Sequence, residues 1–550
     1  MLVRREKKVD LKGRPPPSLP ASSDEALSSL YADDWKESYV NEKSGYDLHG
    51  ALELVEPEPG VHIIGTRWHH SLRDDVDGEL SELKSRLVVQ GVKTFPFLDQ
   101  YGPTYAPLPG WPMVAIFLSL VSKYRLEAFM TDLKKGYLAA DVVKGEDPIY
   151  VKQPPGFEVP GQENKVYKLH RAAYGIPQSG RALHLRIKAY LDSIDMVTVS
   201  DDATLYVGKK DGEKILFLIY VDDGIVAASL PRVEDFLAEF TDEFDVSVRG
   251  KLDSGVFLGR EYKHDVEAGT IVVSVEAQII KALKACKMEF LKPLHIPIQS
   301  GIQYKPWDGE PVEKSAYMSA VGHLLFIGVT RPDIQYATNV ASRFSSNPGP
   351  EHWNLVRRIF SYLSVTRAVG LEISSKSDEG LKAYVDSDFA GDAGSRRSTT
   401  GAVFSLFGST ILTLSKRQGL VTTSTYKAEF VAIAMATAEI EWLSSILTSL
   451  SQHDIITTSP TPILLNDNLS AVGKLLSPTF YEESKALDIK VKYVKELMEK
   501  GFLRVGWLPG VDNVADLMTK PLSAHRARML GKRIGLVGWP EKEDEKWGSR

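Results

Sequence analysis

Cysteine is nearly absent from this sequence, with Cys286 the only one among 550 residues. A single thiol excludes a disulfide within the chain and leaves no second thiol for a cysteine-based zinc site. Long hydrophobic runs are lacking too, since the longest, 113–121 and 215–221, reach at most about half of the ~20 residues that a membrane helix needs. A secretory signal has an apolar segment after its charged start, and the charged start of this sequence is not followed by one. We therefore expect an intracellular protein that is not secreted and has no membrane segment.

Basic residues are not in excess, because 66 Lys and Arg stand against 72 Asp and Glu, for a formal net charge of −6. Coating nucleic acid by charge alone needs clustered Lys and Arg, so any such contact must come from local patches. The remaining composition is typical of globular proteins. At 550 residues the chain is too long for one core, and about three to five compact units are expected.

Two series of strands and helices are predicted behind a polar start. Residues 1–33 are rich in Lys, Arg, Pro, Ser and Asp, which favours a flexible leader. The first series comprises a hairpin within 60–92, a helix at 112–124, a strand at 125–131, a helix at 181–194 and a hairpin at 214–228. The second comprises helices at 316–326 and 350–363, a strand at 381–389, a hairpin at 401–414, a helix at 425–450, a strand at 462–465, a helix at 470–476 and a last helix before Pro521.

Two adjacent carboxylates, Asp222 and Asp223, lie at the tip of the apolar hairpin 214–228. Like charges at contact distance repel, so a divalent cation is the natural partner, and oxygen-only ligands favour Mg²⁺, with Mn²⁺ as a substitute. Asp132, at the end of the strand 125–131, supplies a third carboxylate. Together they predict a two-metal site that activates a primer 3′-hydroxyl and stabilises the leaving pyrophosphate. Taken alone, the Asp222–Asp223 pair is also typical of an exposed hairpin turn, and Asp132 is also typical of a turn at the end of a strand.

The sequence around this hairpin, from about Trp35 to Leu371, resembles the reverse transcriptases of copia-type retrotransposons. The similar segments, in the family's order and spacing, are IGTRW at 64–68, KSRLV at 84–88, TYAP at 104–107, DLKKGYL at 132–138, IYVKQPPGF at 149–157, YGIPQ at 174–178 and YVDD at 220–223. The resemblance implies that Lys84 and Arg86 bind the incoming triphosphate, which suits a guanidinium fork.

The same resemblance implies that Tyr137 is a steric gate against a ribose 2′-hydroxyl and that Gln178 contacts the incoming nucleotide. Alternatives from the residues alone stay open. Tyr137 is also typical of a core aromatic, Lys84 and Arg86 of a solvated strand face, and Gln178 of a residue that satisfies a buried backbone group.

A second acidic series begins at 381, where strand alternation places Asp386 and Asp388 on one face. Glu429 follows on a helix, Asp467 at a strand end and Asp516 near a final helix. The segments RRSTTG at 396–401 and ADLMTKPL at 515–522 resemble copia RNase H, over about 381–522. The resemblance implies that Asp386, Glu429, Asp467 and Asp516 hold two Mg²⁺ ions on an RNA strand. Asp388 is the rival of Asp386, Asp467 could only cap a helix, and Glu429 and Asp516 could be exposed helix acids.

Several positions depart from the family pattern. Ala486 and Lys492 stand where the family has histidines, so a general acid or product-release role for histidine is not carried over. Other departures are Ala173 for leucine, Thr413 and Leu414 at a tryptophan position, and Lys427 for an acid. None removes a predicted metal ligand.

We predict a multidomain protein of α+β and α/β units, namely a right-hand polymerase followed by a connection and an RNase H-like fold. The expected boundaries are a leader at 1–33, reverse transcriptase fingers, palm and thumb-like parts at 34–297, a connection at 298–380, an RNase H-like unit at 381–522 and a tail at 523–550. The expected partners are an RNA template, a DNA primer, dNTPs and RNA–DNA hybrids, and the expected location is a cytoplasmic particle or the nucleus. Capsid-like, protease and integrase regions are absent, so we expect a processed-product equivalent or a truncated genomic copy. The alternative function is a silent relic that binds nucleic acid without chemistry.

Overall fold

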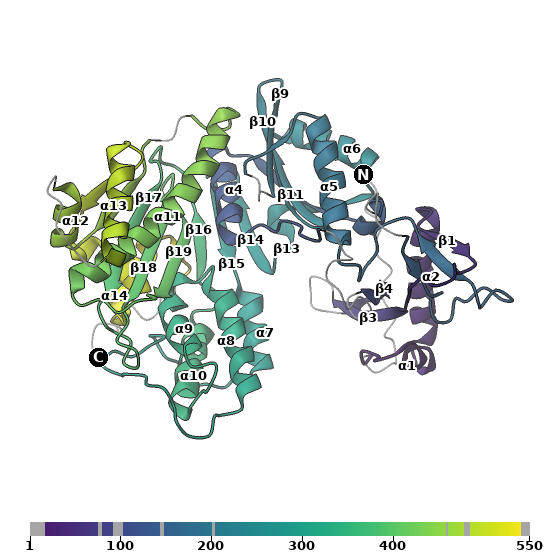
Figure 1. The fold of residues 1–550 in the computed structure, drawn as a ribbon, viewed down its shortest axis with the longest axis horizontal. Coiled ribbons are helices and arrows are strands. Elements are labelled where there is room, and N and C mark those ends of the chain that lie inside the picture. Colours follow the sequence, from purple (N-terminus) through teal and green to yellow (C-terminus); the bar gives the residue numbers. More distant parts are fainter. Residues whose placement is uncertain are drawn as a thin grey trace.

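The computed structural model describes residues 17–74, 80–91, 103–142, 148–200, 204–457, 460–477 and 485–540. Residues 75–79, within the hairpin predicted at 60–92, fall outside them. In Figure 1 the N-terminal elements lie at one end of the molecule and the C-terminal elements at the other, with α4 (Trp111–Tyr124) between them.

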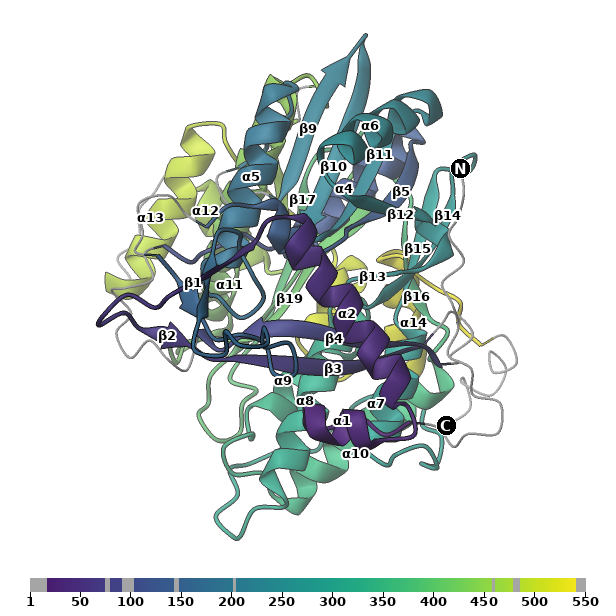
Figure 2. The ribbon, with the colours of Figure 1, turned by 90° about the vertical axis from the view of Figure 1, so that its right-hand side faces the viewer.

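The N-terminal end is a helix pair against short sheets. The helices are α1 (Ser23–Ser28) and α2 (Ala32–Leu48), and the hairpin strands are β3 (Thr66–Asp74) and β4 (Leu80–Val89). A further sheet has the order β1-β7-β6-β2, from β1 (Leu52–Val55), β7 (Val166–Leu169), β6 (Tyr150–Val151) and β2 (Ile63–Ile64). Figure 2 shows α2 lying across the hairpin, where Tyr39 stacks on Trp68 with ring centres 4.4 Å apart.

The predicted flexible leader 1–33 is wrong over its described part. Ser22 caps α1, since its side chain accepts a hydrogen bond from the Glu25 N–H, and both Ala26 and Tyr31 are buried. Packing therefore begins before Trp35, because a short polar segment can fold when its few apolar side chains reach an existing core.

An antiparallel six-stranded sheet lies next along the chain, in the order β12-β5-β11-β10-β9-β8, and it is called the palm-like sheet below after the predicted polymerase palm. Its strands are β12 (Val246–Lys251), β5 (Glu127–Leu133), β11 (Asp223–Ala228), β10 (Glu213–Tyr220), β9 (Leu205–Lys210) and β8 (Val197–Thr198). Leu216 and Leu218 pack with α4, while Phe217 and Ile219 pack with α5 (Ser179–Ser193) and α6 (Leu230–Glu243). Both faces are covered, which explains why β10 is apolar at successive positions.

The middle of the chain combines a sheet with a helix bundle. The sheet has the order β13-β14-β15-β16-β22, from β13 (Val256–Phe257), β14 (Arg260–Asp265), β15 (Thr270–Ser274), β16 (Gly370–Ile373) and β22 (Leu536–Val537). The helices are α7 (Glu276–Ala285), α8 (Lys314–Gly328), α9 (Gln335–Ser342) and α10 (Pro350–Val365), and they share one core. This unit crosses the boundary predicted at 297. The tail predicted from 523 is also wrong over its described part, because α14 (Ala524–Arg533) and β22 belong to the fold.

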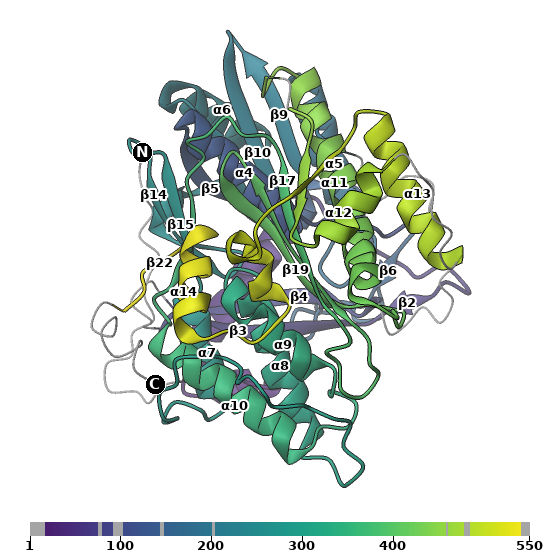
Figure 3. The same ribbon diagram turned by 90° about the vertical axis from the view of Figure 1, so that its left-hand side faces the viewer.

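The C-terminal sheet has the order β19-β18-β17-β20-β21. The strand β18 (Thr399–Leu406) pairs antiparallel with both β17 (Lys382–Asp388) and β19 (Ser409–Arg417), while β20 (Ile463–Asn466) and β21 (Arg504–Trp507) run parallel to β17. Figure 3 shows α11 (Thr425–Gln452), α12 (Leu469–Leu476) and α13 (Lys485–Glu499) grouped beside these strands. α11 is long and apolar enough to cross a membrane, yet 67% of its most apolar window is buried, as in a core helix. α13 and β21 were not predicted, and the helix predicted before Pro521 is a short 3₁₀ turn, η6 (Val514–Met518).

The helix α4 joins the palm-like sheet to the C-terminal unit. One continuous core contains its residues together with Leu216 of β10 and Phe404 of β18. At its C-terminal end the Ser122 hydroxyl donates a hydrogen bond to the Gly269 carbonyl at 2.6 Å and accepts one from the Ser375 N–H at 2.9 Å. The two units therefore share a buried core, while the Ser122 hydroxyl ties α4 to the middle sheet, beside β15 and β16.

Candidate active sites

Three acidic residues meet at one edge of the palm-like sheet. Asp132 lies in β5 directly opposite Asp223 at the start of β11. Asp222 occupies the tight turn between β10 and β11, where its carbonyl accepts a hydrogen bond from the Leu133 N–H at 2.8 Å. The turn begins with Val221 at φ 58°, a left-handed conformation that is unfavourable for a β-branched residue. The surrounding strands impose this strain, and it holds Asp222 next to the other two acids.

Burial governs the charge of Asp222 and Asp223. It is the main reason that the pKa of Asp222 is raised, and the Asp132 carboxylate raises it further. Burial also raises the pKa of Asp223 to about 6, with the Arg249 guanidinium opposing the rise and the neighbouring carboxylates adding to it. Buried acids that repel one another gain from a shared cation. The oxygen ligands are of the kind that Mg²⁺ prefers, but among the described residues only the C-terminal trio brings one oxygen from each acid within 4.8 Å of the others, so metal binding by Asp132, Asp222 and Asp223 stays a prediction.

One cation of the chain already contacts the trio. Arg249 of β12 forms an ion pair with Asp132 through Nη2, and its Nη1 lies 3.0 Å from Oδ1 of Asp223. Arg249 was not among the predicted site residues. Its local sequence, DVSVRGK, has no motif that marks it, and only the pairing of β12 with β5 brings it to the acids.

The predicted nucleotide-binding residues include a group that borders the trio. The Arg86 guanidinium lies 5.4 Å from the centre of the Tyr174 ring. That ring meets Tyr137 edge-on, with ring centres 4.8 Å apart and planes at 76°. Burial and then the Asp222 carboxylate raise the pKa of Tyr137, which places its hydroxyl near the acids. Tyr174 was quoted only as part of the YGIPQ segment, and that segment was the available signal.

Lys84 and Gln178 are the other two predicted nucleotide-binding residues. Lys84 lies two positions before Arg86 on β4, and both cations lower the pKa of Glu42 of α2, which burial raises. Gln178 is buried and immediately precedes α5. The role of Lys84 and Gln178 in binding nucleotide stays a prediction.

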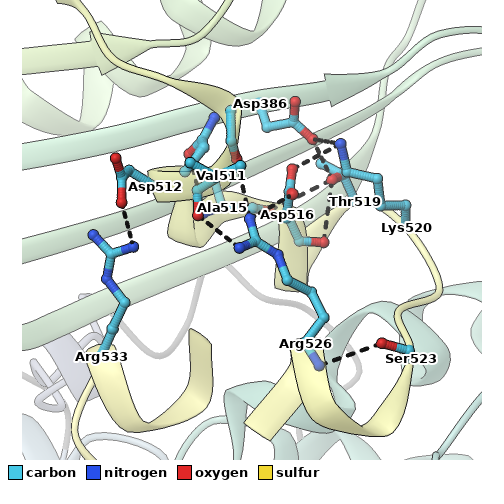
Figure 4. Close-up of polar contacts among 12 residues, drawn as sticks. Asp386, Val511, Asp512, Ala515, Asp516, Thr519, Lys520, Ser523, Arg526 and Arg533 are labelled. Atoms are coloured by element: carbon cyan, nitrogen blue, oxygen red, sulfur yellow. Dashed lines mark hydrogen bonds and ion pairs between the residues drawn. The ribbon is translucent and has the colours of Figure 1, made fainter. Parts of the chain in front are cut away.

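A second acidic trio lies in the C-terminal unit. Asp386 of β17, Asp467 after β20 and Asp516 of η6 each offer one carboxylate oxygen, and these oxygens all lie within 4.8 Å of one another. Figure 4 shows Lys520 reaching two of these acids, with Nζ 2.7 Å from Oδ1 of Asp516 and 3.4 Å from Oδ2 of Asp386. The Thr519 hydroxyl donates to Oδ2 of Asp386. The arrangement fits a divalent metal, because three carboxylates converge on one point.

Glu429 of α11 is buried beside this trio. The Asn466 side-chain amide donates to its Oε2 at 2.9 Å. Burial raises the pKa of Glu429 to about 8, and the Asp386 carboxylate is the largest charge that adds to the rise. The pKa of Asp386 is raised to about 6 for the same main reason, opposed by Lys520.

The geometry separates two pairs of alternatives. Within the described residues Asp386 belongs to the trio and Asp388 does not. Asn468, whose side chain accepts from the Ala471 N–H, caps α12, so the Asp467 carboxylate is not used as the cap. Lys492 lies on α13, whereas the side chain of Ala486 is outside the described residues.

Taken together, the chain is a protein with a reverse transcriptase domain, since residues 50–300 match the family described as reverse transcriptase (RNA-dependent DNA polymerase). It belongs to the Pol polyprotein family of copia-type retrotransposons. It is 30% identical over 518 residues to the Pol polyprotein of transposon RE1 of Arabidopsis thaliana, covering 94% of this chain and 34% of that protein. A Ty5-1 transposon protein of Saccharomyces cerevisiae is 30% identical over 299 residues, covering 54% of this chain and 96% of that protein.

A third relative, the Pol polyprotein of transposon RE2 of Arabidopsis thaliana, is 29% identical over 531 residues, which is 95% of this chain and 35% of that protein. The chain thus spans about a third of the length of the RE1 and RE2 polyproteins. Among solved structures, LC11-RNase H1 from compost has a TM-score of 0.21 and 19% identity, covering 26% of this chain and 93% of that one. The RNase H domain of a Mycobacterium tuberculosis protein has a TM-score of 0.18 and 13% identity, and the match covers 28% of this chain and 97% of that one.

Proposed function

We propose that the chain synthesises DNA on RNA and DNA templates and cleaves RNA in RNA–DNA hybrids. The observation that carries this proposal is the strand register that sets Asp132 opposite Asp223, with Asp222 in the adjoining turn. In this proposal the β3–β4 hairpin is the fingers, the six-stranded sheet is the palm, and α7 to α10 lie where a thumb and connection belong.

Asp132, Asp222 and Asp223 would hold Mg²⁺, or Mn²⁺ in its place. Two such ions supply a lowered pKa for the primer 3′-hydroxyl and charge neutralisation at the leaving pyrophosphate. Arg86 supplies a planar fork for phosphate oxygens. Tyr137 forms the wall that a ribose 2′-hydroxyl would meet. The Tyr174 ring supports the side chains of Tyr137 and Arg86, because it contacts both.

In the C-terminal unit Asp386, Glu429, Asp467 and Asp516 would hold the ions that act on the RNA strand. Glu429, with its pKa near 8, is held by Asn466 and becomes a metal ligand only after it loses its proton. Lys520 balances part of the negative charge until then.

The test is primer extension by the full purified chain on a primed RNA template with dNTPs and Mg²⁺. Asp222→Asn keeps the shape of the side chain but removes its charge, so we expect extension to fall at least about a hundredfold with folding intact. The matched control is Asp211→Asn, in the turn between β9 and β10. Extension by Asp222→Asn at the parent rate would remove the polymerase assignment.

The silent relic remains the second candidate, because Ala486 and Lys492 leave the nuclease half without the two imidazoles of the family pattern. The same purified chain on a labelled RNA–DNA hybrid separates the two. Cleavage that is lost in Asp386→Asn supports the nuclease, and no cleavage by the parent chain supports the relic for that half.

A further inference from the structure

Arg249 reaches the palm acids because β12 is irregular where it pairs with β5. Val248 pairs with Thr131 and Gly250 pairs with Met130, so Arg249 is the extra residue of a β-bulge. A bulge changes the direction in which a side chain points, and bulges are frequent beside active sites. Here the redirected side chain is a guanidinium that contacts both Asp132 and Asp223.

The guanidinium occupies oxygens that a metal ion would need. Its two ion pairs use Oδ1 of Asp132 and Oδ1 of Asp223, and Mg²⁺ binds carboxylate oxygens at about 2.0–2.1 Å in a strict octahedron. A cation that holds those oxygens and a metal that coordinates them compete for the same charge. The Arg249 side chain is 40% exposed, so it can move into water at little desolvation cost.

A purely structural role would be to pin β12 to β5, but the ladder already does this on both sides of the bulge. Lys251 further along the strand makes such a strand-to-strand pair, with Nζ 3.0 Å from Oε2 of Glu127. Arg249 differs from Lys251 because both of its partners are predicted metal ligands.

We propose that Arg249 is the built-in counter-cation of the palm site, which holds Asp132 and Asp223 together without metal and leaves them as metal enters. It is a positioning residue that sets the affinity of the site for divalent ions. This inference rests on the proposed function, in which the trio binds metal.

Removal of the competing charge should tighten metal binding. Both ion pairs are partly exposed and therefore modest in strength, so we expect Arg249→Ala to lower the dissociation constant for Mn²⁺ at the palm by about tenfold, which corresponds to about 1.4 kcal/mol. Arg249→Lys keeps the charge but loses the fork, and its affinity should lie between the two. Without metal, Arg249→Ala should melt at a lower temperature, and added Mg²⁺ should raise its melting temperature more than that of the parent.

The measurement is Mn²⁺ binding by electron paramagnetic resonance on the full chain carrying Asp386→Asn, which weakens the second site. Lys251→Ala in the same background is the control, because it removes the same charge from the same strand. Binding by Arg249→Ala that is no tighter than by Lys251→Ala, or weaker than by the parent, would overturn the inference. If Asp223→Asn in this background binds Mn²⁺ as tightly as its parent, the palm site itself fails, which is a separate result.

Discussion

The buried hydroxyl of Ser122 tests how firmly α4 is joined to the middle sheet, because Gly269 precedes β15 and Ser375 follows β16. It donates to the Gly269 carbonyl and accepts from the Ser375 N–H, at 2.6 and 2.9 Å. Ser122→Ala removes this partner from two backbone groups, and a buried polar group without a partner costs about 1–3 kcal/mol. Allowing for partial relaxation, we expect the free energy of unfolding to fall by ~2–4 kcal/mol.

Ser119 provides the matched control on the same helix. It is fully buried, and its hydroxyl has no hydrogen-bond partner among the described residues. Ser119→Ala should therefore change stability by less than about 0.5 kcal/mol or raise it. Urea unfolding followed by tryptophan fluorescence, read at the first transition because the chain has several units, compares the two. Equal midpoints for the two variants would show that the joint depends on apolar packing of α4 alone.

Two further predictions concern the sites. Tyr137→Ala is expected to raise ribonucleotide over deoxyribonucleotide incorporation roughly tenfold or more, because it opens the wall near the sugar, and an unchanged ratio in single-nucleotide insertion would return Tyr137 to a core role. For Glu429, whose pKa is raised from 4.5 to about 8, the folded state holds the proton more tightly than the unfolded state, so stability in a chelator should fall as pH rises through this window. Glu429→Gln should flatten that part of the profile in pH-dependent melting, and an unchanged slope would contradict the burial argument.

Local patterns predicted the elements whose environment is uniform along their length. β10 and β11 were expected from the apolar segments around Asp222 and Asp223, because both faces of these strands are buried. α4 and α11 were expected from their apolar content, and the observed bounds differ from the predicted ones by a few residues. Long, strongly patterned elements depend little on distant partners, so they can be predicted from a single sequence.

Features that depend on distant pairing were not predicted. Leu536 pairs with Leu371 at a sheet edge, and the local sequence of the predicted tail does not indicate this pairing. Tyr31 is buried in a core that also contains residues far from it in the sequence. The β-bulge at Arg249 depends on how β12 meets β5, so the only cation that contacts both Asp132 and Asp223 within the described residues was missed.

Each acidic trio carries a cation of its own, and the two cations are built in by different means. Lys520 comes four positions after Asp516, so the segment that brings an acid also brings its counter-charge. Arg249 depends instead on a bulge in a neighbouring strand. An unneutralised cluster of buried carboxylates opposes folding, because like charges at contact distance repel. Both trios can therefore persist in the folded chain before metal binds. Both cations are 40% exposed, but only Arg249 depends on an irregular strand, so we expect a single substitution to change the metal affinity of the palm site most.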